Sequence, residues 1–103
     1  MVTLSFEFDK DQIERAGITE EDLLRPMRNI ARRDNIVELE YGVFGMEGSD
    51  ALCIVSMAVL ELDRADKRYI EYLKSWRLTT EDSSEDCVKE IRKLRERKIE
   101  IGA

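Results

Sequence analysis

The clearest hydrophobic pattern in this chain runs from Leu52 to Trp76, where apolar side chains recur every three or four residues. This spacing is the a/d pattern of a helix that buries one seam, and a single acidic residue interrupts it. The positions of the seam are Leu52, Val55, Val59, Leu62, Asp66, Tyr69, Leu73 and Trp76. We predict one long central helix over about residues 50–77, with Ser49 or Asp50 as its cap.

The first ten residues of that helix, 51–60, are uncharged and would also suit a buried strand. Ala, Leu and Met outnumber Ile and Val in this segment, and it is longer than a usual strand. We therefore favour the helix. If the strand formed instead, the chain would be an α+β sandwich with 51–60 as its central strand.

Two further segments carry an apolar stripe at helical spacing. The first follows Thr19, which resembles a capping box together with Asp22, and its stripe lies between Leu23 and Ala31. The second follows Ser83 or Ser84, either of which can cap a helix. Its inward stripe is made of Cys87, Val88, Ile91 and Leu94.

Two segments alternate apolar and polar residues with the period of a strand, residues 2–8 and residues 37–41. Neither is stable alone, so we expect them to pair as a two-stranded element beside the helices. Between them, residues 9–16 suit a short helix that Gly17 ends. The predicted fold is a mainly α, three- to four-helix bundle with a short two-stranded β element. Residues 1–103 are expected to form a single domain.

Composition narrows the function classes. The chain has 23 Asp and Glu against 17 Lys and Arg, a formal net charge of −6, and no His. Since His is the commonest general base and metal ligand, we expect no catalytic residues, no metal site and no cofactor. Two Cys fit reduced thiols in the cytoplasm, and no apolar run approaches the ~20 residues that span a bilayer.

The charges are arranged in blocks along the chain. Residues 36–63 hold six acids and no base, whereas residues 25–35 include a stripe formed by Arg25, Arg28 and Arg32. Most such blocks complement helix dipoles. An acidic inhibitor that mimics nucleic acid remains an alternative function. Direct nucleic-acid binding is disfavoured, because the protein is acidic overall and carries no nucleic-acid motif.

A Gly-spaced segment precedes the long helix and is the most irregular part of the sequence. Its spacing matches no phosphate-binding motif, and Glu47 and Asp50 would repel a phosphate. Apolar side chains on a Gly-rich loop can repack against another protein. The candidate partner loop is Val43, Phe44, Gly45 and Met46.

The predicted long helix has more apolar surface than a small domain needs. We therefore expect a non-enzymatic, cytoplasmic protein-interaction domain that forms a homodimer and binds an unknown protein partner. The aromatic end of the helix is charged on its flanks, so we place the interface there. The predicted interface residues are Tyr69, Tyr72, Leu73 and Trp76.

Overall fold

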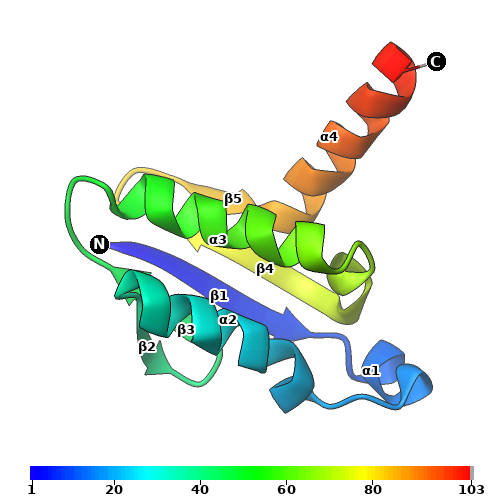
Figure 1. Cartoon of the computed structure of the whole chain (residues 1–103), viewed down its shortest axis with the longest axis horizontal. Helices are drawn as coiled ribbons and strands as arrows, with labels where there is room; N and C mark the ends of the chain where they lie inside the picture. Colours follow the sequence, from blue (N-terminus) through cyan, green and yellow to red (C-terminus); the bar gives the residue numbers. More distant parts are fainter. Residues whose placement is uncertain (103) are drawn as a thin grey trace.

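A computed structural model describes residues 1–102, with side chains as far as residue 97 (Figure 1). Within these residues the chain forms five strands, four α-helices and one 3-10 turn. In chain order they are β1 (Val2–Phe8), α1 (Lys10–Ala16), α2 (Glu20–Asp34), β2 (Val37–Glu40), β3 (Val43–Met46), α3 (Ala51–Ala65), η1 (Tyr69–Tyr72), β4 (Leu73–Thr79), β5 (Ser84–Asp86) and α4 (Cys87–Gly102).

The strands form one antiparallel sheet in the order β2-β3-β1-β4-β5. The first strand is therefore central, and both helical connections pass over a neighbouring strand: α1 and α2 over β3, and α3 over β1. The part from β1 to β4 has the split β-α-β arrangement, which β5 and α4 extend at one edge.

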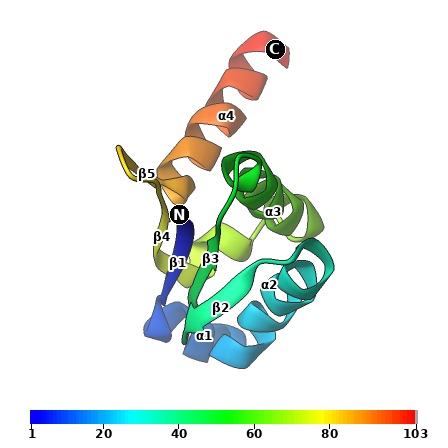
Figure 2. The ribbon, with the colours of Figure 1, turned by 90° about the vertical axis from the view of Figure 1, so that its left-hand side faces the viewer.

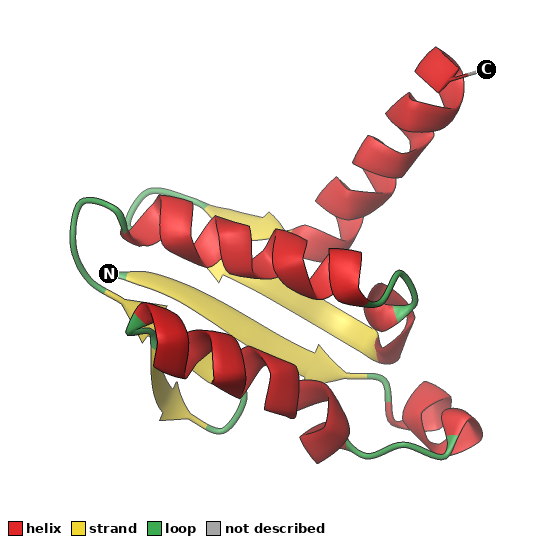
Figure 3. Cartoon of the chain, in the orientation of Figure 1, coloured by secondary structure: helices red, strands yellow, loops and turns green. Residues whose placement is uncertain are grey.

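Helices α2 and α3 cover the same face of the sheet, and α4 rises away from this layer (Figures 1 and 2). The covered face of the sheet carries Val2, Leu4, Phe6, Phe44, Trp76 and Leu78, which are all buried. The other face of β1 and β4 carries Thr3, Ser5, Glu7, Ser75, Arg77 and Thr79. The alternation along β1 thus separates a core face from a polar face, as in other one-sided antiparallel sheets. Figure 3 shows the two helices lying across the strands.

An aromatic cluster lies at the centre of the core. The Phe6 ring is 5.5 Å from the Trp76 ring and 5.7 Å from the Phe44 ring, and the Tyr69 ring is 5.6 Å from Trp76. Trp76 is 0% exposed, and its indole N–H finds no acceptor among the described residues. Packing rather than hydrogen bonding therefore holds this side chain.

The predicted mainly α bundle is wrong, because the chain is an α+β protein with a five-stranded sheet. The long helix over 50–77 ends at Ala65, where the Asp66 backbone turns extended and its carboxylate accepts a hydrogen bond from the Arg68 N–H at 2.9 Å. The rest of the segment is η1 and β4. Its seam residues are buried as the spacing predicts, but from a turn and a strand.

The alternative sandwich is also wrong in detail, because residues 51–60 lie in helix α3 and form no strand. The two predicted strands exist as β1 and β2, but they do not pair with each other, since β3 lies between them. That third strand comes from the segment interpreted as a loop. The last helix begins at Cys87, where Asp86, not Ser83 or Ser84, accepts a hydrogen bond from the Val88 N–H.

The local signals of α1 and α2 are confirmed, whereas Asp50 at the start of α3 makes no capping hydrogen bond through its side chain. Thr19 and Asp22 form a capping box at the start of α2, with reciprocal hydrogen bonds of 3.2 and 2.9 Å. Asp9 caps α1, and Gly17 ends it with a φ of 69°, a left-handed conformation that costs glycine little. These signals involve residues within one turn of each other, so no distant contact changes them.

Replacing Phe44 with Ala should lower the free energy of unfolding by about 3–5 kcal/mol, because it opens a cavity beneath both helices. Urea unfolding followed by circular dichroism measures this loss. The matched control is Val37→Ala on the neighbouring strand, where the side chain is exposed and the change should stay within about 0.5 kcal/mol. Equal losses in the two variants would show that β3 does not contribute to the core.

Candidate functional site

The four side chains predicted to form an interface lie in or beside the core of a single chain. Tyr69, Leu73 and Trp76 are buried, and Tyr72 is half-buried. The Tyr69 hydroxyl donates a 2.6 Å hydrogen bond to the Leu23 carbonyl of α2, and burial raises the pKa of this phenol. These side chains already make their contacts within one chain. We therefore no longer propose an interface at these four residues.

The predicted partner loop is the inner strand β3. Phe44 points into the core and is 0% exposed, while Val43 and Met46 are partly buried. A Cβ atom at Gly45 would lie 2.7 Å from Leu39 Cδ1, so the glycine allows Leu39 to lie against the sheet. Pairing with β1 and β2 on both sides occupies this backbone.

The acidic block is partly neutralised by two arginines of α2, of which Arg28 belongs to the arginine stripe. The Arg28 guanidinium donates to Glu38 at 2.9 Å and also to Glu21, and it holds the pKa of the Glu38 carboxyl below its usual range. Arg33 donates to Glu61 at 3.0 Å. Both the acids and the bases of these segments therefore hold α2 against its neighbours, and no uniform acidic face results.

A cavity of about 730 Å³ lies where β1, α1, the start of α2 and β4 meet beside Tyr41. Three of the four acids in its lining are engaged. Glu7 pairs with Lys74 at 3.6 Å, Glu20 accepts a 3.1 Å hydrogen bond from the Tyr41 hydroxyl, and Asp9 caps α1. The lining has no thiol or imidazole, and the amines of Lys10 and Lys74 stand among its carboxylates, so positive and negative groups are mixed in this cavity.

A second hollow is apolar and runs along the flank of α3. Its floor is formed by Val59, Leu78, Cys87 and Ile91, with Leu60 and Leu94 at its walls, and its volume is about 170 Å³. An adjoining hollow of about 250 Å³ shares Ser56, Leu78 and Glu85 with it and extends to Leu52 and Thr80. We call the two together the α3–α4 groove.

The groove exists because two helices do not cover five strands. Strands ~4.8 Å apart make a sheet about 24 Å wide, whereas two helices packed side by side cover about 20 Å. Helix α4 contributes only its first turns to the remaining edge and then departs (Figure 1). Apolar side chains therefore stay exposed, with Leu52 at 48% on one wall and Leu94 at 47% on the other.

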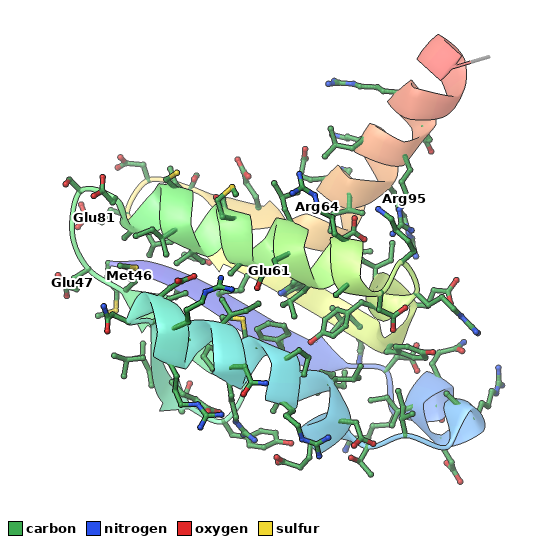
Figure 4. All side chains as sticks on the ribbon, in the orientation of Figure 1. Met46, Glu47, Glu61, Arg64, Glu81 and Arg95 are labelled. Atoms are coloured by element: carbon green, nitrogen blue, oxygen red, sulfur yellow. The ribbon has the colours of Figure 1, made fainter. Side chains whose placement is uncertain are left out.

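One ion pair sets the position of α4. Arg95 donates to the buried Asp63 of α3 at 2.5 Å and to the Lys67 carbonyl at 2.8 Å. Lys67 also lies 3.7 Å from the Asp63 carboxylate. Figure 4 shows Arg95 beside the C-terminal end of α3, near Arg64. This contact ties α4 to α3 at one end of the groove and leaves the other end open.

The one thiol that lines the groove is poorly ionised. Burial, followed by the nearby Asp86 and Glu85 carboxylates, raises the pKa of the Cys87 thiol to about 12, so the thiolate nucleophile is scarce at neutral pH. Among residues 1–102, no three His, Cys, Asp or Glu side chains are placed to hold a metal ion. None of the helices in that range is both long and apolar enough to cross a membrane.

No protein-family model, curated protein or solved structure matches this chain. The geometry of the groove is therefore the basis for calling it a candidate functional site. Sequence analysis identified the α4 wall, including Leu94, but assigned it to the core and did not single out Ser56 or Leu60. The available signal was the nearly all-round apolar character of 51–60, which exceeds what one buried helix face requires.

Thiol labelling should separate the two cysteines. Cys53 is exposed on α3, whereas Cys87 is buried. Iodoacetamide at a pH of about 8 should therefore label one thiol per chain rapidly, and the second only after unfolding. The Cys53→Ser variant should lose the rapid phase, as mass spectrometry would show. Rapid labelling of both thiols in the folded protein would contradict the placement of Cys87.

Replacing Arg95 with Met should lower the free energy of unfolding by about 1–3 kcal/mol, because Asp63 keeps its buried charge and loses its main partner. A double-mutant cycle with Asp63→Asn should give a coupling energy of about 1–2 kcal/mol. The matched control is Arg92→Met, an exposed position on the same helix. A coupling energy near zero would mean that the pair does not position α4.

Proposed function

We propose that this protein is a non-enzymatic protein-interaction domain and that the α3–α4 groove receives an apolar segment of a partner. The supporting observation is the apolar hollow that joins Leu60 and Leu94 between α3 and the start of α4, with the exposed Leu52 farther along the same groove. Contiguous apolar surface of this kind usually marks an interaction site, because its exposure to water is costly.

The chemistry of the other surfaces favours binding over catalysis. Most carboxylates of the large cavity are held in ion pairs, hydrogen bonds or a helix cap, and the one thiol in the groove has a raised pKa. The acidic-mimic alternative needs contiguous free carboxylates, whereas Glu38, Glu61 and Asp63 are paired with arginines. We place the protein in the cytoplasm, since both of its cysteines are free thiols.

The shape of the groove favours a helical segment. An amphipathic helix presents an apolar stripe about 10 Å wide. Such a helix can pack beside α3 on the sheet in the same way as α2 packs beside α3 on its other side. An extended strand would instead need a free sheet edge. The β5 edge beside the groove is short and carries Glu85 and Asp86, which discourage added strands.

Affinity capture from the source cell tests this function, with the full chain as bait. A stoichiometric partner should be captured by the wild-type protein and lost with Leu60→Asp, which places a charge at the groove wall. The matched control is Met57→Asp on the same helix, because Met57 is 54% exposed and outside the groove. Identical capture by all three baits would contradict the proposed site.

A further inference from the structure

The groove has an acidic end. The turn between β4 and β5 carries Glu81 and Asp82, and Glu85 lines both hollows of the groove. Residues 79–86 contain four acids and no base. Figure 4 places Glu81 near the N-terminal end of α3, opposite to the end where Arg95 lies. A segment that fills the groove must therefore be apolar against the first hollow and basic where it meets Glu85.

Helix α4 of the same protein has these properties. Its side chains beyond the first turns include the exposed Leu94 together with exposed Arg92, Lys93 and Arg97. Residues 87–103 have a net charge of +3. Beyond the Arg95 contact the helix projects away from the sheet (Figures 1 and 2). A short helical segment without tertiary packing is only marginally stable in water, so this half of α4 gains most from a partner.

The lengths also agree. From Leu94 to Gly102 the helix extends about 12 Å, and the groove wall from Leu52 to Leu60 also extends about 12 Å, at ~1.5 Å per residue. Leu94 stands at the mouth of the groove. Two copies of α4 can therefore cross at Leu94 on a two-fold axis, and the projecting half of each then lies along the α3 of the other chain.

We propose that the α3–α4 groove receives the projecting half of α4 from a second copy of this chain, in a reciprocal symmetric dimer. The inference rests on the proposed function of the groove and specifies its occupant. Each chain carries both the groove and the helix that fills it. Two copies can therefore make the same contact twice about a two-fold axis, which is an isologous interface that closes at the dimer. In this arrangement Arg97 of each copy, one turn beyond Leu94, lies near Glu85 of the other.

Sedimentation velocity and light scattering on the full chain test the dimer. At about 100 μM the mass should be near twice the 12.0 kDa of one chain, with a dissociation constant in the micromolar range expected of a small interface. Leu60→Asp and Leu94→Asp should each weaken the dimer at least about tenfold, whereas Met57→Asp should not. A monomer at this concentration, or a dimer unaffected by both groove variants, overturns the proposal.

A charge exchange tests the reciprocal geometry. Arg97→Glu and Glu85→Lys should each weaken self-association about tenfold at low salt, because both copies of the contact become repulsive. In a mixed dimer of the two variants, one contact joins the two substituted side chains and the other joins the two native ones. Opposite charges then meet at both contacts, so the mixture should associate about as strongly as the wild type. Circular dichroism controls for folding. A mixture as weak as its components overturns the arrangement.

The two proposals fail in different ways. The wild type could be a monomer and still capture a different protein, which the Leu60→Asp variant fails to capture. In that case the dimer is wrong and the groove remains an interaction site. If the dimer forms and responds to the groove variants, the bait should capture its own copy from the source cell. If neither association depends on Leu60, both proposals are wrong.

Discussion

Burial of the Trp76 indole is the constraint on which the rest of this structure depends. The side chain packs between Phe6 of the central strand and Tyr69 of η1, and it is fully enclosed. An aromatic side chain of this size stabilises a small core only if it is covered on all sides. Strand β4 must therefore lie next to β1, and η1 must turn back over the sheet, where the Tyr69 hydroxyl reaches Leu23 of α2.

The same packing leaves one edge of the sheet short of cover. Helices α2 and α3 enclose the aromatic cluster, and the strands beyond it meet only the first turns of α4. The Asp63–Arg95 ion pair then holds α4 at an angle to α3, so the space between them stays open. The candidate site is thus a consequence of core geometry, and the apolar character of its walls is what supports the proposed binding role.

Local sequence determined the helix ends and the alternating strands. Thr19 and Asp22, Asp9 and Gly17 act within one helical turn, so their roles can be predicted without knowing the fold. The alternation in β1 follows from a core on one side and water on the other. The seam also identified Tyr69, Leu73 and Trp76 as buried, because burial requires apolar side chains whatever the backbone conformation is.

Tertiary structure decided the backbone of that buried segment and the position of every surface. A three- and four-residue spacing fits a helix, but it also arises where a 3-10 turn leads into a strand, and only pairing with β1 selects the strand. The segment Val43–Met46 became an inner strand for the same reason. The acids of residues 36–63 form one block in sequence, yet arginines from α2 and α4 neutralise half of them. The groove itself joins α3, β4, β5 and α4, and its shape depends on how distant elements pack, which no local pattern records.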